Sequence, residues 1–503
     1  MSATLGQQQL ESYLWGAATI LRGLVDAGDY KQFIFPLIFY KRLSDVWDED
    51  HSKALAVYEG NEELAQAEAN ERFCVPDGAH WNQVREVPQN VGRTIQDAFR
   101  TIEAANPGRL DGIFGDAPWT NKTRLPDRTL KELLEHFSSQ TLSLAQVPED
   151  SLGDGYEYLV GRFADDGGST AQEFYTNRTL VHLMAQMLKP MTGESIYDPT
   201  CGTGGMLLSA LAEVRRGGGE HRSLRLFGQE RNHMTASIAR MNLVLHGVED
   251  FEIERGDTLS RPAFLDGDLL RTFDVVLANP PYSIKRWNRE AWATDQWGRN
   301  FLGTPPQSRA DYAFLQHILR SMDHTSGRCA VLFPHGVLFR RAEEPLRAAL
   351  IESDLIECVL GMGPNLFFNS SMEACVVVCR SVKPPERRQR ILFINAVDEV
   401  TRMKAVSFLR PEHQHRIRSA YEAFEDDPGF AKVVHLDEIS NCGNSLSIPL
   451  YVSRRGESDE SPSPEESVAV AWHRWETIAN EVRPRVARLA SRLGALGGTA
   501  HNE

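Results

Sequence analysis

The chain has 503 residues, 42% of them hydrophobic, which is enough for two or three domains with substantial cores. It has no apolar run of membrane-spanning length, and its first residues lack the basic and apolar regions of a signal peptide. Its formal net charge is −15. Because phosphate contacts dominate affinity for DNA, an acidic chain is expected to act on nucleic acid only through a partner or through clustered cations.

Cysteine usage and missing motifs exclude several classes of protein. The seven cysteines form no CxxC pair, and their odd number argues against a full disulfide framework, so a bacterial or archaeal cytoplasm is expected. Cys375 and Cys379 lie four apart in a strand-like run and are expected to be buried, reduced thiols on one side. The sequence has no Walker A motif, HExxH or paired zinc ligands, so no metal is predicted.

The first part of the chain, residues 1–150, is predicted to be a helical domain. Apolar residues from Leu10 to Val25 recur with a helical period. A second helix, residues 30–48, is rich in aromatic side chains and should be buried against other helices. Further helices are expected near residues 90–104 and 127–137.

From about residue 150, short apolar strands alternate with helices, which is typical of a parallel α/β sheet. Strands are expected at residues 195–197, 224–229, 251–255, 273–278, 329–334, 356–360, 375–379 and 391–395. Helices are expected at residues 179–188, 207–214, 234–245 and 312–322. The predicted catalytic domain covers residues 151–410, with a C-terminal extension of its core at residues 411–453.

The chain ends in a polar Pro/Ser-rich linker, residues 454–467, and a helical tail, residues 468–503. Apolar residues of the tail, from Trp475 to Leu496, are spaced alternately by four and three, as in a coiled coil. A helix packed on its own domain would also show this seam. The position after a linker favours a partner chain.

A glycine-rich turn follows the first strand of the α/β region, in Asp198-Pro-Thr-Cys-Gly-Thr-Gly-Gly205. Gly202, Gly204 and Gly205 remove side chains where a ligand must approach the backbone. Asp198, also expected to bind the cofactor, can accept hydrogen bonds at the strand end or hold the loop. Such turns also serve nucleotides or pure architecture. S-adenosylmethionine is expected at the carboxyl ends of these strands.

Two acidic residues end the next two strands. Glu230 is suited to both ribose hydroxyls of a nucleoside, and Asp257 is suited to an adenine amino group. A single acid after a strand is usually a helix cap. Two in consecutive loops after a glycine turn favour cofactor binding.

The tetrapeptide Asn279-Pro280-Pro281-Tyr282 follows another strand, 74 residues after Gly205. An aromatic exocyclic amine is a poor nucleophile because its lone pair is delocalised into the ring. If the Asn279 side-chain oxygen and the Pro280 carbonyl accept its two N–H bonds, the lone pair is freed for methylation. Pro281 stiffens the loop, and Tyr282 offers a ring for stacking on a flipped base.

In order, these motifs closely resemble those of the modification (M) subunit of type I restriction-modification systems, which are N6-adenine DNA methyltransferases of the gamma-type motif order. The resemblance covers most of the chain and includes Gln172-Glu-Phe-Tyr-Thr-Asn-Arg178, Gly327 to Phe339 and Pro364 to Phe368. It implies a class I S-adenosylmethionine-dependent methyltransferase: an α/β, Rossmann-like, mostly parallel sheet with a helical N-terminal domain and a C-terminal helical tail.

The resemblance also implies site residues. The cofactor should be bound by Glu173, Phe174, Tyr175, Thr176, Asn177 and Arg178, together with Thr203, Gly204, Gly205 and Glu230. Residues Asn279 to Tyr282 should bind and activate the adenine. The family usually has proline where this chain has Asn177, so a less rigid loop is expected there.

The family's organisation implies partners that explain the acidic charge. A separate specificity (S) subunit reads the DNA sequence, two M subunits flank it, and a restriction (R) subunit can join. The tail, residues 468–503, would pack on helical spacers of the S subunit. Two other functions stay open: methylation of a protein glutamine amide or an rRNA guanine amine, which also use Asn-Pro-Pro-Tyr, and a catalytically silent scaffold of a defence complex.

Overall fold

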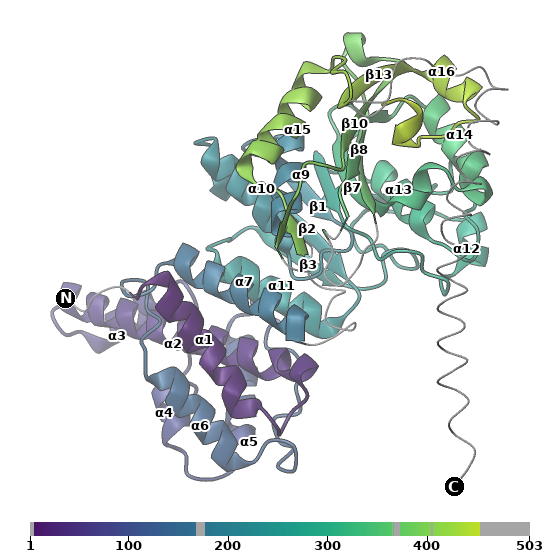
Figure 1. The fold of residues 1–503 in the computed structure, drawn as a ribbon. Coiled ribbons are helices and arrows are strands. Elements are labelled where there is room, and N and C mark those ends of the chain that lie inside the picture. Colours follow the sequence, from purple (N-terminus) through teal and green to yellow (C-terminus); the bar gives the residue numbers. More distant parts are fainter. Residues whose placement is uncertain (1–4, 167–176, 365, 367–372, 404–405, 453–503) are drawn as a thin grey trace, which may run out of the picture. The chain divides into compact units, whose positions relative to one another are not determined.

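The structure is a computed structural model that describes residues 5–166, 177–364, 366, 373–403 and 406–452 (Figure 1). All of these residues belong to one compact unit, Met1–Val452. The predicted linker, residues 454–467, and the predicted heptad helix, residues 468–503, lie outside the described residues.

The amino-terminal part is helical, as the sequence predicts. Its helices are α1 (Gln7–Leu21), α2 (Lys31–Val57), α3 (Glu62–Ala69), α4 (Trp81–Glu86), α5 (Val91–Ala105), α6 (Asp127–Ser138) and α7 (Glu149–Asp166). The second helix runs nine residues beyond the predicted end at Asp48, and Pro36 lies inside it.

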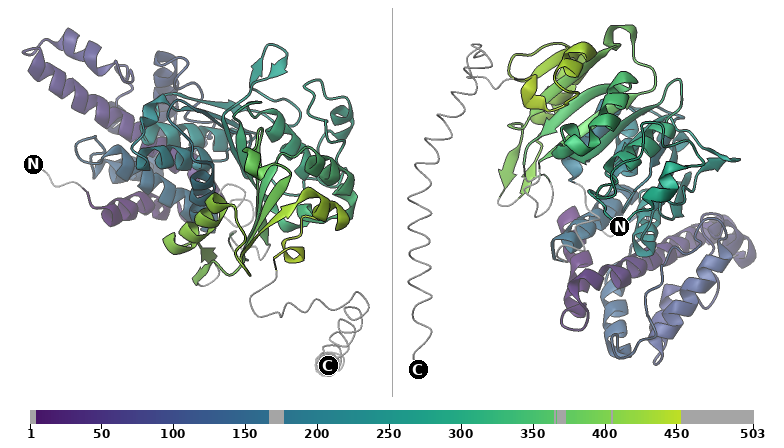
Figure 2. Two further views of the ribbon diagram at one scale, coloured as in Figure 1. Left: turned by 90° about the horizontal axis from the view of Figure 1, so that it is seen from above. Right: turned by 90° about the vertical axis from the view of Figure 1, so that its right-hand side faces the viewer.

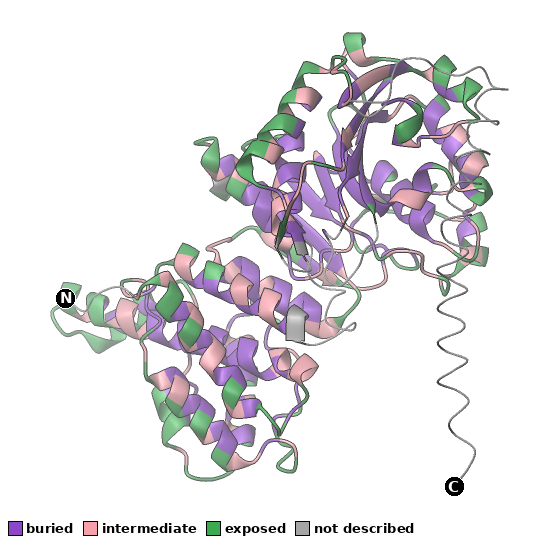
Figure 3. Ribbon diagram, in the orientation of Figure 1, coloured by how far each residue is buried: buried purple, intermediate pink, exposed green. Residues whose placement is uncertain are grey.

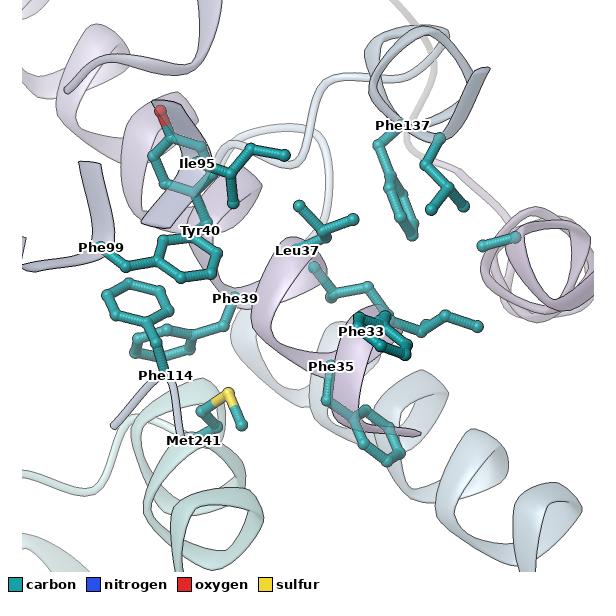
Figure 4. Close-up of a cluster of buried hydrophobic side chains, with 14 of the residues drawn as sticks. Phe33, Phe35, Leu37, Phe39, Tyr40, Ile95, Phe99, Phe114, Phe137 and Met241 are labelled. Atoms are coloured by element: carbon teal, nitrogen blue, oxygen red, sulfur yellow. The ribbon is translucent and has the colours of Figure 1, made fainter. Parts of the chain in front are cut away.

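Aromatic side chains fill the core of this helical part. Phe33, Phe35 and Phe39 of α2 are buried, as predicted. The ring of Phe39 meets that of Phe114 edge-on (Figure 4). The rings of Phe99 and Phe114 stack with centroids 4.0 Å apart. Such pairs add about 0.5–1.5 kcal/mol each beyond the burial of their area. The core takes in Leu152, Tyr156 and Leu159 of α7, which lie beyond the predicted boundary at residue 150.

A nine-stranded sheet forms the second core, in the order β13-β10-β8-β9-β7-β6-β1-β2-β3. Its strands are β1 (Ser195–Asp198), β2 (Arg225–Glu230), β3 (Phe251–Arg255), β6 (Val275–Ala278), β7 (Arg328–Pro334), β8 (Ile356–Met362), β9 (Ala374–Arg380), β10 (Arg390–Ala396) and β13 (Ala431–His435). Every predicted strand is present. β9 and the edge strand β13 run antiparallel to their neighbours, so the sheet is mostly parallel.

Five strands among the described residues are not predicted from the sequence. They are the edge strand β13 and two short hairpins, formed by β4 (Leu265–Asp266) with β5 (Leu269–Leu270) and by β11 (Thr401–Met403) with β12 (Val406–Phe408). In β13 only the residues at positions 431 and 434 are buried, so no continuous apolar run marks it.

Helices cover both faces of the sheet (Figures 1 and 2). One face packs on α9 (Arg178–Leu188), α10 (Gly205–Arg216), α11 (His233–Leu245) and α15 (Pro411–Ala423). The other packs on α13 (Asp311–Arg320), α14 (Glu344–Glu352) and α16 (Leu436–Asn441). A short helix, α12 (Arg289–Ala293), follows β6. The central strands are therefore buried throughout (Figure 3), which is why they read as continuous apolar runs.

Helix α11 belongs to both cores. Its residues Ala236, Ala239 and Leu243 pack on the sheet, whereas Ile238 and Met241 pack with the aromatic residues of the helical part (Figure 4). Hydrogen bonds reinforce this contact, from Ser237 Oγ to the Gly112 carbonyl at 3.0 Å and from Arg240 to the Asp111 carbonyl at 2.7 Å.

Candidate active site

Strand order places the predicted motifs at one edge of the sheet. β1 pairs in parallel with β2 on one side and with β6 on the other, so the chain's direction of winding reverses at β1. The loops after these three strands carry Gly202 to Gly205, Glu230 and Asn279 to Tyr282. Such a switch point is where open α/β sheets bind their ligands.

The loop after β1 has the conformation that glycine allows. Gly202 and Gly204 have φ of 55° and 84°, in the left-handed region, and α10 begins at the next residue, Gly205. Asp198 is buried at the end of β1, and its Oδ1 accepts from the Thr200 amide at 2.9 Å. Burial raises the pKa of the Asp198 carboxyl to about 8, and the nearby Glu230 charge adds to this.

The Glu230 carboxylate ties the loop after β2 to the glycine loop. Its Oε2 accepts from the Gly202 amide at 3.1 Å and its Oε1 from the Asn232 amide at 2.7 Å. A carboxylate at this place is of the kind that accepts hydrogen bonds from ribose hydroxyls. Glu230 and the glycine loop therefore lie together.

Asp257, at the end of β3, caps a turn. Its Oδ1 accepts from the amides of Leu259 and Ser260 at 3.1 and 3.4 Å, and its Oδ2 lies 3.8 Å from Arg231. The neighbouring Thr258 hydroxyl donates to the Pro199 carbonyl at 2.5 Å, which joins this turn to the loop after β1.

The buried Arg299 holds the same turn from the other side. Its guanidinium donates to the carbonyls of Thr258 and Leu259 at 3.0 and 2.8 Å, and it forms a buried ion pair with Asp295. The sequence gives no signal for this role, because Arg299 lies some 40 residues from its carbonyl partners.

Two side chains brace the glycine loop from behind, the half-buried Arg178 and the buried Asn242. Arg178 donates to the Gly205 carbonyl at 3.3 Å and forms an ion pair with Glu157 of α7. Asn242 of α11 donates to the Thr203 carbonyl at 2.9 Å and to Glu157 at 2.7 Å. Glu157 thus connects the helical part to the glycine loop, a role that sequence reasoning missed.

Asn177 is the N-cap of α9. Its Oδ1 accepts from the amide and hydroxyl of Thr179 at 3.1 and 2.7 Å, and its Nδ2 donates to the Ser407 carbonyl at 2.8 Å. These bonds hold the position by side-chain contacts where the family usually relies on proline. The remaining predicted cofactor residues of this segment, Glu173 to Thr176, lie outside the described residues.

The Asn-Pro-Pro-Tyr segment begins directly after β6. The Tyr282 hydroxyl donates to Asn279 Oδ1 at 2.7 Å, and burial raises the pKa of Tyr282 well above its usual value. Pro280 is buried and Pro281 is exposed. The side chains of Asn279 and Tyr282 are therefore in direct contact.

Asp311 fixes the residue that follows this segment. Ser283 has a positive φ of 53°, and its amide donates to Asp311 Oδ1 at 2.8 Å. Asp311 is 2% exposed, and its Oδ2 accepts from Arg340 at 2.8 Å. The sequence analysis did not identify Asp311 or Arg340 as part of the site. An acid at the start of a helix, such as Asp311, resembles an ordinary helix cap.

Potential metal ligands do not gather in one place in the described part of the chain. No group of three or more potential ligands is positioned to hold a metal ion there. Within the same residues, no helix combines the length and apolarity needed to cross a membrane. All seven cysteines are free, and Cys375 and Cys379 are buried, as predicted.

The sheet, its switch point and this site define a class I S-adenosylmethionine-dependent methyltransferase with an Asn-Pro-Pro-Tyr motif. Residues 147–460 match the family model described as N-6 DNA Methylase, and residues 10–137 match the HsdM N-terminal domain. The chain belongs to the N-6 DNA methylase family, as an M subunit of the type I restriction-modification kind.

Individual relatives agree. The type I restriction enzyme MjaIX methylase subunit from Methanocaldococcus jannaschii is 28% identical, over 90% of this chain and 86% of its own. The MpnII methylase subunit from Mycoplasma pneumoniae is 29% identical, over 90% of each chain. A solved structure of the type I restriction-modification system methyltransferase subunit from Streptococcus thermophilus is 29% identical with a TM-score of 0.79, covering 89% of this chain and 100% of that chain.

Proposed function

We propose that this chain transfers a methyl group from S-adenosylmethionine to N6 of an adenine flipped out of DNA, with the adenine chosen by a separate S subunit. The observation that carries the proposal is the placement of Asn279 to Tyr282 after β6, beside the β1 strand whose glycine loop is joined to Glu230. This arrangement brings an amine-binding segment next to a nucleoside-binding loop.

The chain's own residues suit the cofactor. The left-handed glycines leave the loop after β1 without side chains at the point of closest approach, and Glu230 offers a carboxylate for the ribose. Asp257, on the neighbouring loop, would accept from the adenine amino group through its carboxylate. When bound, S-adenosylmethionine supplies an electrophilic methyl group on a positively charged sulfur.

Asn279 and Pro280 would activate the nucleophile. The Asn279 side-chain oxygen and the Pro280 carbonyl each accept one N–H of the adenine amino group, which draws the nitrogen toward tetrahedral geometry. These fixed dipoles also stabilise the positive charge that develops on N6 as the methyl group arrives. The surplus proton leaves afterwards to water, so no general base needs to act before the transfer.

Tyr282 would serve the flipped base through its ring. A base leaves its duplex at a cost of a few kcal/mol, and stacking on an aromatic side chain recovers about 1–3 kcal/mol. In the structure the Tyr282 hydroxyl occupies Asn279 Oδ1. The arriving amine must therefore displace this hydroxyl as the ring turns to meet the base.

The partners follow from the family and the charge. An S subunit would read the sequence, a second M subunit would flank it, and an R subunit can join. The tail, residues 468–503, would pack on the S subunit. Deletion of this tail should abolish assembly with S while S-adenosylmethionine binding persists. Normal assembly of the truncated chain would refute the role of the tail.

The decisive experiment uses labelled S-adenosylmethionine and the Asn279→Ala variant assembled with its S subunit. The wild type should label adenine N6 in DNA, and the variant should lose about 10²–10³-fold in kcat, as when one preorganised polar group is removed. Cofactor binding should be unchanged. Labelling of a protein glutamine or an rRNA guanine instead would favour the alternative substrates, and no cofactor binding would favour a silent scaffold.

A further inference from the structure

We infer that Lys285, Arg286 and Arg341 form a phosphate-binding surface that holds the DNA backbone beside the flipped adenine. This surface, called here the edge cations, rests on the proposed function because its ligand is the strand that carries the target base. It provides the clustered positive charge that a chain with a net charge of −15 needs to approach DNA.

The three edge cations are exposed. Among the described residues, no carboxylate lies within 4.0 Å of the charged groups of Lys285, Arg286 or Arg341. Acids near these cations in the sequence mostly pair elsewhere. Asp295 pairs with Arg299, Asp311 and Glu343 pair with Arg340, and Glu344 is half-buried at the start of α14. Glu290 is the exposed carboxylate of the segment after β6. Positive charge is therefore left over at this edge.

The edge cations lie at the same edge of the sheet as Asn279. Lys285 and Arg286 follow Tyr282 by three and four residues. Arg341 follows the carboxyl end of β7, which pairs in parallel with β6, so both groups lie at the same edge of the sheet. Asp311 joins the two segments, because its carboxylate binds the Ser283 amide on one side and Arg340 on the other.

The backbone that carries Lys285 and Arg286 is held by side chains. Gln307 Nε2 donates to the carbonyls of Lys285 and Trp287 at 2.9 and 3.3 Å, and Trp287 Nε1 donates to the Gln307 carbonyl at 3.2 Å. Arg289 Nε donates to the Pro305 carbonyl at 2.8 Å. A loop fixed in this way loses little conformational entropy when a phosphate binds.

An exposed aromatic residue lies close to Arg341 in the sequence. Phe339, two residues before Arg341, is 51% exposed, and its ring meets that of His335 edge-on at 6.1 Å. Cations interleaved with aromatic rings are typical of surfaces that follow a nucleic-acid strand. This favours DNA over an acidic protein as the ligand of the edge cations.

The test measures binding of the full-length chain to a fluorescent DNA duplex over a series of salt concentrations. Each phosphate contact contributes about 0.9 to the slope of log affinity against log salt. The triple variant Lys285→Ala/Arg286→Ala/Arg341→Ala should therefore lower the slope by about 2–3. S-adenosylmethionine binding and thermal stability should match the wild type.

Two controls isolate the effect. Exchanging the charges in Lys285→Arg/Arg286→Lys should keep the slope, because phosphates respond to charge. The pair Arg225→Ala/Arg390→Ala removes exposed arginines at the first residues of β2 and β10, at the opposite edge of the sheet, and should also leave the slope unchanged.

The inference is overturned if the triple variant keeps the wild-type slope, if the wild-type chain shows no salt-dependent DNA binding, or if the triple variant loses only assembly with the S subunit. The outcome is separate from that for the proposed function. A normal effect of the edge cations on DNA binding, with no methyl transfer to adenine by the wild-type complex, would contradict the proposed function and leave this surface standing.

Discussion

The hydroxyl of Tyr282 donates a hydrogen bond of 2.7 Å to Asn279 Oδ1. Both side chains belong to the segment proposed to hold the target adenine, and the oxygen that accepts this bond is the one proposed to accept from the amine. In this conformation the Tyr282 hydroxyl satisfies the Asn279 oxygen. When a base binds, the adenine amino group would replace the hydroxyl as the donor to that oxygen. The exchange limits the net gain from the Asn279 contact.

Removal of the Tyr282 hydroxyl tests this exchange. Tyr282→Phe keeps the ring and deletes the competing donor, so the flipped base should bind several-fold more tightly, in line with a hydrogen bond of about 1 kcal/mol. The fluorescence of 2-aminopurine at the target position reports base flipping directly. Tyr282→Ala should instead weaken flipping by about 1–3 kcal/mol because it deletes the stacking surface. Weaker flipping by Tyr282→Phe would contradict the proposed competition.

The brace behind the glycine loop should control cofactor affinity. Glu157→Gln keeps an acceptor for Asn242 but removes the charge that pairs with Arg178. A hydrogen bond to a charged group contributes about 1.5–3 kcal/mol, so affinity for S-adenosylmethionine should fall by about tenfold or more. Calorimetric titration measures this, and Glu63→Gln on the exposed side of α3 is the matched control. An unchanged affinity of Glu157→Gln for S-adenosylmethionine would show that these contacts do not support cofactor binding.

Asp198 should make stability depend on pH. Its pKa is about 8 in the folded chain, against 3.8 for an ordinary aspartate, because it is buried. The folded state then binds more protons than the unfolded state, so stability falls as pH rises from about 4 to about 8 and levels off above that. Asp198→Asn keeps an acceptor for the Thr200 amide. Its melting temperature should fall less than that of the wild type between pH 6 and pH 8. Parallel melting curves would refute the assignment.

The strands could be predicted because they are long, buried apolar runs. The side-chain contacts between distant segments could not be predicted. β7, β8 and β9 are apolar over most of their length and are buried on both faces, so the sequence alone locates them. The Asn279 to Tyr282 contact joins residues three apart and was predictable as one site. Asn242 and Arg299 bind loop carbonyls far from them in the sequence, and Glu157 acts on the glycine loop through Arg178. Only the folded chain brings these side chains to the site.

Asp311 should position the Asn-Pro-Pro-Tyr segment without touching the substrate. Asp311→Asn keeps an acceptor for the Ser283 amide and weakens the pairing with Arg340, whereas Asp311→Ala removes both contacts and leaves Arg340 without this partner. A displacement of about 1 Å at a reacting group can cost about 10²-fold in rate, so Asp311→Ala should lower kcat by that order and Asp311→Asn by much less.

The position of Asp311 separates this effect from general destabilisation. Affinity for S-adenosylmethionine should stay at the wild-type level, because the Asp311 carboxylate binds Ser283 and Arg340, which follow β6 and β7. The rate loss should persist at saturating DNA and cofactor, with the chain still folded by its melting curve. Asp311→Glu keeps the charge, so its kcat should be higher than that of Asp311→Ala if the carboxylate positions Ser283. Equal losses in cofactor affinity and kcat for Asp311→Ala would show that the residue serves the fold alone.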